Sequence, residues 1–141
     1  MLRARGKERL APQPGLDALP ELLDEGRHGG HEIRLEVEGE PVRLPAGLDL
    51  TAYRIVQEGL TNARKHAPDA DVSVSVCASP GDGLTVEIRN PSPARATTAI
   101  PGAGTGIIGL AERASLAGGR LEHGHTPAGE FRLWAWLPWP A

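Results

Sequence analysis

The chain has 141 residues, of which 40% are hydrophobic and 23% charged, with a formal net charge of −3 and a pI of about 5.9. This length fits one domain with a real hydrophobic core, and the composition excludes disordered and fibrous proteins. There is no broad basic field, so nucleic acid is not an expected partner, although four basic residues occur within the first ten positions.

The single cysteine, Cys77, excludes an intramolecular disulfide and is typical of a reducing compartment. No run of about 18 apolar residues is present, and the N-terminus lacks the apolar core of a signal peptide. We therefore expect a cytoplasmic domain without direct membrane contact, whose parent protein can still be membrane-anchored.

The first half of the chain predicts two helices and a strand after a linker at 11–15 that contains two prolines and a glycine. Leucines at helical spacing predict a short amphipathic helix from residue 16 to about Gly26. Alternation at 33–38 predicts a half-buried strand, and 48–67 predicts the longest helix, which Pro68 ends.

Two segments with period-two alternation, 71–79 and 84–90, are joined by turn residues and predict an antiparallel hairpin. The stretch from Pro91 to Gly104 has no periodicity, and a connection of this length is usually a functional loop or lid.

A second helix is expected at about 107–117, closed by two glycines, and a second hairpin at 120–125 and 131–139. Trp134 and Trp136 alternate with apolar residues, which predicts a sheet covered on both faces or an aromatic patch offered to a partner domain. Core packing is the favoured interpretation. His123 and His125 share a face of the same hairpin, but no third metal ligand is nearby in sequence, so an exposed hairpin explains them better.

The long helix carries a polar stripe. Placing residues 100° apart groups four polar side chains on one face: Glu58, Asn62, Lys65 and His66. The opposite face is apolar: Ala52, Val56, Gly59, Leu60, Ala63 and Ala67.

Any surface helix carries such polar residues, but this combination also suits Mg²⁺ bound to phosphate. Mg²⁺ usually takes one or two protein oxygens and fills its other positions with phosphates and water, so the amide oxygen of Asn62 could serve as ligand. Lys65 could neutralise phosphate oxygens, and Glu58 could accept a proton or hold a metal-bound water.

A glycine-rich segment, PGAGTGIIGL at 101–110, joins the loop to the second helix. Glycines let backbone N–H groups approach an anion, and a helix N-terminus adds unsatisfied donors and the positive end of its dipole. GTGIIG also matches the dinucleotide fingerprint, but no strand runs directly into it and no βαβ crossover follows. A flexible linker is the alternative interpretation.

Together, TAYRIVQEGLTNARKHA at 51–67 and GAGTGIIGLAERASLAGGRLEHG at 102–124 resemble the N-box and second glycine box of histidine kinase ATP-binding domains. The resemblance covers about residues 14–138 and is greatest to actinobacterial kinases related to nitrate and desaturase sensors. It implies the Bergerat-type fold of the GHKL superfamily, an α+β two-layer sandwich in which a mixed, mostly antiparallel sheet of about five strands packs on about three helices.

The resemblance also implies roles for individual residues. Glu58 matches the N-box glutamate, a catalytic role, and Asn62 the magnesium-binding asparagine. The other positions that match ATP-binding ones are Lys65, His66, Asn90, Gly102, Gly104, Thr105, Gly106, Ile107, Gly109 and Leu110.

The first glycine box departs from the family pattern. Where relatives have an Asp that accepts a hydrogen bond from the adenine amino group, this sequence has Asn90, followed by Pro91 instead of spaced glycines. An amide oxygen still accepts a hydrogen bond, but more weakly than a carboxylate. Glu130 stands where many relatives have a Thr near the adenine.

No histidine in the chain has the sequence context of a phosphoacceptor, so we expect the acceptor on a dimerisation domain of the same parent kinase and, beyond it, a response regulator. We interpret residues 1–14 as a linker or the end of a preceding dimerisation helix, and 15–141 as the ATP-binding domain. The expected function is transfer of the γ-phosphoryl group of Mg-ATP to that histidine in two-component signalling. The alternatives are a degenerate interaction module that binds nucleotide weakly or not at all, and a serine kinase of the anti-sigma-factor type.

Overall fold

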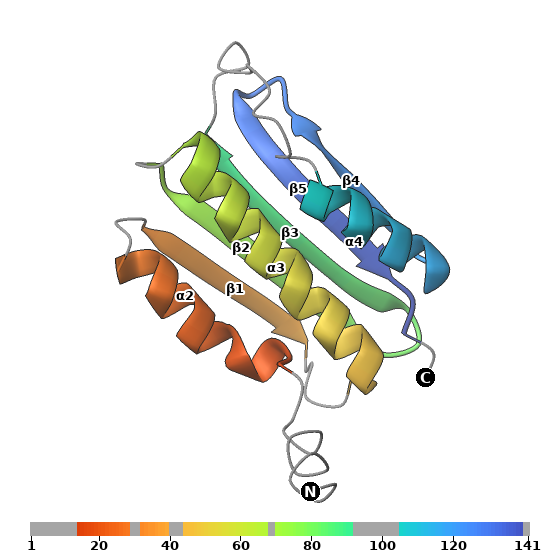
Figure 1. Cartoon of the computed structure of the whole chain (residues 1–141). Coiled ribbons are helices and arrows are strands. Elements are labelled where there is room, and N and C mark those ends of the chain that lie inside the picture. The colour runs from red at the N-terminus through yellow and green to blue at the C-terminus, as the bar shows by residue number, and fades with distance from the viewer. Residues whose placement is uncertain (1–13, 29–31, 40–43, 68–69, 92–104, 140–141) are drawn as a thin grey trace, which may run out of the picture.

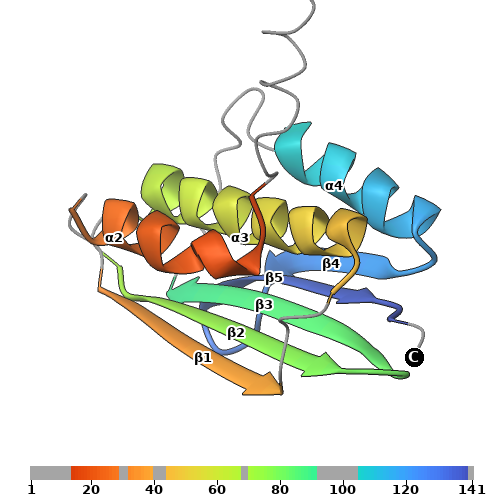
Figure 2. The same ribbon diagram turned by 90° about the horizontal axis from the view of Figure 1, so that it is seen from below.

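The structure, a computed structural model, describes residues 14–28, 32–39, 44–67, 70–91 and 105–139, with only the backbone of Thr105. It is a five-stranded sheet with helices on one face, so the predicted two-layer α+β architecture is confirmed (Figures 1 and 2). In this part of the chain, no helix combines the length and apolarity needed to cross a membrane.

The elements follow the predicted order with small shifts at their ends. The helical elements are the short 3₁₀ turn η1 (Leu16–Ala18), α2 (Leu19–His28), α3 (Ala46–His66) and α4 (Thr105–Leu116). The strands are β1 (Ile33–Gly39), β2 (Val72–Ser79), β3 (Gly83–Pro91), β4 (Arg120–His125) and β5 (Glu130–Leu137). Helix α4 thus begins two residues earlier than the sequence predicted, which places Gly106 inside its first turn.

The strand order is β1-β2-β3-β5-β4, with β1 and β2 parallel and all other neighbours antiparallel. Helix α3 forms the crossover between the parallel pair and lies along the middle of the sheet (Figure 2). It packs closely because Gly59 has no side chain: a Cβ there would lie 2.9 Å from the Cβ of Ile88 on β3. This contact sets the height of α3 above β3.

The apolar stripe of α3 is confirmed at Ala52, Val56, Gly59, Leu60 and Ala63, which are buried against the sheet. Ala67 lies just beyond the last helical turn as its C-cap. Three further α3 residues are buried that the sequence interpretation left off this face: Thr51, Ile55 and Asn62. The buried face is therefore wider than predicted, and Asn62 lies on it.

The face of the sheet opposite the helices is open in the described part of the chain, so the favoured core packing of the tryptophans is wrong. Trp134 and Trp136 lie half-buried on this open face. The guanidinium carbons of Arg120 and Arg132 both lie 5.4 Å from the Trp134 ring centre, and Trp136 covers Gly83. Neighbouring side chains, and not a second layer of helices, cover these rings.

Candidate functional site

Asn62 is a buried polar residue on the face of α3 that packs on the sheet. Its side chain is 3% exposed, and its amide oxygen has no hydrogen-bond partner among the described residues. A buried acceptor without a partner costs about 1–3 kcal/mol, so such groups are rare and usually have a functional reason. An unpaired amide oxygen is also a ligand that Mg²⁺ accepts, so Asn62 fits the predicted magnesium position.

Asn90 lies at the same level of the molecule as Asn62. Helix α3 and strand β3 run in the same direction, and Gly59 touches Ile88 (Figure 1). Asn62 is three residues after Gly59, which is about 4.5 Å further along the helix axis. Asn90 is two residues after Ile88, which is about 6.6 Å further along the strand. Asn90 is also buried, and its side-chain nitrogen donates a hydrogen bond to the Pro91 carbonyl oxygen at 3.1 Å. The two buried amides therefore lie at a similar level, both beyond the contact of Gly59 with Ile88.

Glu58 lies at the N-terminus of α4. A Cβ built on Gly106 would overlap the Glu58 carboxylate, so the carboxylate lies directly against the first turn of α4. The N–H groups of this turn have no partner within the helix and attract negative charge. Thus the structure brings Glu58 of α3 and Gly106 of α4 together.

A groove of about 600 Å³ opens between α3 and α4 from this point. Residues of both helices line it, and all of them are exposed or half-buried except the buried Leu110: Arg54, Gln57, Glu58, Gly106, Gly109, Leu110, Glu112, Arg113 and Leu116. Two large apolar residues of α4 are strongly exposed, Ile108 at 61% and Leu116 at 88%. The groove was not predicted from the sequence.

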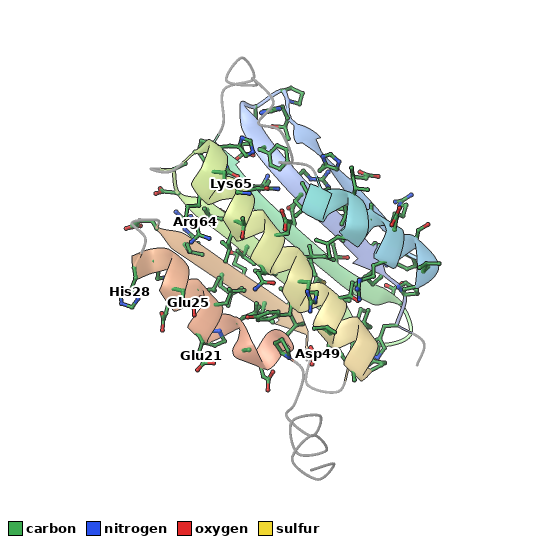
Figure 3. The ribbon with its side chains drawn as sticks, viewed as in Figure 1. Glu21, Glu25, His28, Asp49, Arg64 and Lys65 are labelled. Carbon is green, nitrogen blue, oxygen red and sulfur yellow. The ribbon has the colours of Figure 1, made fainter. Side chains whose placement is uncertain are left out.

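The remaining predicted site residues fall into three groups. Ile107 and Leu110 are buried in the core, so only their backbone could meet a phosphate. Lys65 and His66 are exposed in the last turn of α3; Lys65 extends to the side away from α2, whereas Arg64 extends toward α2 (Figure 3). Gly102, Gly104 and the side chain of Thr105 lie outside the described residues.

Glu130 does not lie beside Asn90 in the sheet. Phe131, and not Glu130, is paired with Asn90 across β3 and β5. Neighbouring residues of a strand point to opposite faces, so Glu130 points to the open face, where its carboxylate lies 3.6 Å from the Arg89 guanidinium. The residue beside the expected adenine position is therefore Phe131.

The arrangement combines three kinds of group on the helix-facing side of the sheet. Free backbone donors at the start of α4 suit an anion, the amide oxygen of Asn62 suits a hard cation, and the Asn90 amide suits a polar edge of a ligand. Among the described residues no cluster of three His, Cys, Asp or Glu side chains could hold a metal ion by itself. A cation at Asn62 would thus need oxygens from the ligand.

No protein-family model matches the chain, but individual proteins do. The sensor histidine kinase LnrJ of Bacillus subtilis is 27% identical over 125 residues, covering 84% of this chain and 30% of LnrJ. The sensor histidine kinase YxjM of the same species is 36% identical over 110 residues, covering 76% of this chain and 26% of YxjM. The chain spans less than a third of the length of these relatives.

Solved structures with the same fold are histidine kinases. The mycobacterial sensor histidine kinase MprB superposes with a TM-score of 0.61 at 19% identity, covering 86% of this chain and 93% of that structure. Full-length ShkA in complex with AMPPNP gives a TM-score of 0.66 at 19% identity, covering 86% of this chain and 29% of that structure. The fold is therefore that of the histidine kinase catalytic domain.

Sequence relatives and fold agree. The relatives are sensor histidine kinases, and the chain has the fold of the histidine kinase catalytic domain. Both findings agree with the resemblance that the N-box and second glycine box carry.

Proposed function

We propose that this domain binds Mg-ATP and donates the γ-phosphoryl group to a histidine on a dimerisation and phosphoacceptor domain of its parent kinase. The observation that carries this proposal is the buried, unpaired amide oxygen of Asn62. A cation bound there recovers the cost of leaving that oxygen without a partner. The AMPPNP complex of ShkA, a structure with the same fold, supports nucleotide as the ligand.

The triphosphate lies between α3 and the N-terminus of α4. The N–H groups of Gly106 and Ile107 and the helix dipole bind phosphate oxygens, and Lys65 adds positive charge at the end of α3. Asn62 would hold Mg²⁺, which would supply positive charge to the phosphates. The base lies toward Asn90, whose amide oxygen accepts a hydrogen bond from the adenine amino group.

Glu58 takes up the proton of the reaction. The acceptor imidazole nitrogen attacks the γ-phosphorus, the bond to the bridging oxygen breaks, and ADP leaves with the electron pair. The carboxylate of Glu58 accepts the N–H proton of the imidazole, because it lies beside the phosphate position at Gly106. Catalysis is then mainly positioning and charge stabilisation.

The groove between α3 and α4 gives the partner access to this point. Glu58 and Gly106 line one end of it, and Leu110 and Leu116 supply apolar surface. With Ile108 also exposed, α4 offers the apolar anchors that bind a partner helix, and Arg54, Glu112 and Arg113 supply a charged rim.

Calorimetric titration with Mg-AMPPNP tests the proposal. The native domain should bind, and binding should weaken strongly without Mg²⁺ or in Asn62→Ala. Thr61→Ala is the matched control, because Thr61 is the next residue on α3 and bonds only within the helix, to the Gln57 carbonyl. No heat from the native protein would contradict the proposal and favour an interaction module without nucleotide.

Phosphotransfer is then measured with the phosphoacceptor domain of the parent kinase. Glu58→Gln should keep nucleotide affinity and lose most of the transfer rate, because it removes the proton acceptor and keeps the shape. Transfer to a serine of a sigma-factor antagonist, and not to histidine, would contradict the histidine kinase assignment.

A further inference from the structure

Three rings form a cluster where β4 ends and β5 begins. The ring centroid of Phe131 lies 5.5 Å from that of His125 in an edge-on arrangement and 6.4 Å from that of His123. His125 pairs with Phe131 across the two strands, and His123 pairs with the buried Leu133. All three rings therefore lie on the helix-facing side of the sheet.

The exposure of these rings is unusual for that side of the sheet. Elsewhere it forms the hydrophobic core, with Leu133, Ala135 and Leu137 of β5 fully buried. Phe131, by contrast, is only half-buried, and both histidines are exposed. The helix-facing side thus ends in an aromatic surface that the described helices do not cover.

Asn90 borders this surface directly, since it is paired with Phe131 across β3 and β5. Its side-chain nitrogen donates a hydrogen bond to the Pro91 carbonyl oxygen. Its amide oxygen is therefore the atom that can accept a hydrogen bond from a ligand amino group. A neutral amide binds such a group more weakly than a carboxylate does. Additional affinity for a base must then come from contacts other than this hydrogen bond.

We propose that Phe131, supported by His125 and His123, is the surface on which the base of the nucleotide stacks. This inference rests on the proposed function, because it concerns the base end of the same site. Stacking on an aromatic ring holds any base, and the Asn90 oxygen then selects a base with an amino donor. Phe131 is a specificity and affinity residue of this chain, and its neighbour Glu130, on the other face, is not.

Binding of Mg-AMPPNP to three Phe131 variants tests the ring directly. Phe131→Leu keeps an apolar side chain of similar size without a ring, and should weaken binding about 10-fold, the typical effect of losing one stacked base. Phe131→Tyr restores the ring and should bind within roughly twofold of the native protein. Trp134→Leu is the control, because it removes a larger ring from the opposite face of the same strand and should leave affinity unchanged.

Magnetisation transfer between nucleotide and protein tests the same contact without substitution. Phe131 is the only phenylalanine, so nuclear Overhauser effects from the adenine H2 or H8 protons to phenylalanine ring protons identify it without ambiguity. We expect such effects in the Mg-AMPPNP complex.

The outcomes separate the two proposals. If the native domain fails to bind AMPPNP, the proposed function is wrong. If it binds, but Phe131→Leu binds equally well and no ring contacts are seen, the stacking surface is wrong and the function stands. Equal loss in the Leu and Tyr variants without ring contacts would show a packing role only, which also overturns the stacking proposal.

Discussion

Substituting Gly59 by Ala should destabilise the domain, although alanine is the better helix former. The added Cβ would lie 2.9 Å from both Cβ and Cγ1 of Ile88 and 3.0 Å from Cγ2, closer than these atoms pack. Ile88 cannot rotate away, because the branching Cβ is itself one of the three atoms. Overpacking of this kind costs about 1–3 kcal/mol, and helix propensity returns about 1 kcal/mol. The difference is a net loss of about 0–2 kcal/mol in the free energy of unfolding, and we expect a value near the middle, about 1 kcal/mol.

Gly47 is the matched control in the same helix, since a Cβ there would meet nothing within 4 Å. Gly47→Ala should therefore stabilise the domain by about 0.5 kcal/mol. Urea unfolding followed by circular dichroism measures both changes, and the melting temperature of Gly59→Ala should fall by roughly 2–6 °C.

A second background makes the cause specific. In Ile88→Ala the atoms Cγ1 and Cγ2 are gone and only Cβ remains, so Gly59→Ala should destabilise the domain less in this background than in the native one. If Gly59→Ala is at least as stable as the native protein, or is equally destabilising in the Ile88→Ala background, contact with the Ile88 side chain does not set the spacing of α3 and β3.

Three further results are expected. Asn62→Leu should raise the free energy of unfolding in urea by about 1 kcal/mol while abolishing Mg-AMPPNP binding, because the unpaired oxygen costs stability; a destabilised variant would contradict this. Asp49→Ala should lose about 1 kcal/mol in the same assay, since its carboxylate accepts the Leu16 N–H at 2.8 Å; an unchanged midpoint would show that this bond contributes nothing. The pKa of the Cys77 thiol is raised, mainly because the thiol is partly removed from water and secondly because the Glu38 carboxylate lies near it. At any given pH, Cys77 is therefore less ionised than a free cysteine. Alkylation by iodoacetamide, followed by mass spectrometry, should be slower than for a free cysteine and faster in Glu38→Gln; a rate equal to that of free cysteine at pH 8 would argue against a raised pKa.

The order and type of elements followed from local chemistry. Period-two alternation identified β2, β3 and β5, the proline at position 68 marked the end of α3, and paired glycines marked the end of α4. The contact between Glu58 and Gly106 was not predicted, because local sequence patterns do not show which helices meet. The parallel pairing of β1 with β2 did not follow, because residue alternation does not encode strand direction.

The errors came from register and tertiary burial. Glu130 was expected near the adenine, but it lies on the face of the strand opposite to Phe131, the residue that pairs with Asn90. Placing Asn62 among exposed polar residues overlooked that a polar group can lie on the buried side of a helix when it serves a ligand. The tryptophans of β5 were predicted to pack in a core, because residue alternation does not show what covers a side chain. In the structure, arginine side chains lie over the Trp134 ring, and no second layer of helices does so in the described part of the chain.

The most direct test of the site is a ¹H–¹⁵N correlation spectrum of the isotope-labelled domain, titrated with Mg-AMPPNP. Side-chain NH₂ signals of Asn62 and Asn90 and the backbone signals of Gly106 and Ile107 should shift together in one saturable event, while Cys77 and Trp134 on the open face stay in place. Shifts confined to the open face, or a shift at Gly106 with none at either asparagine, would contradict a single nucleotide site between α3 and α4.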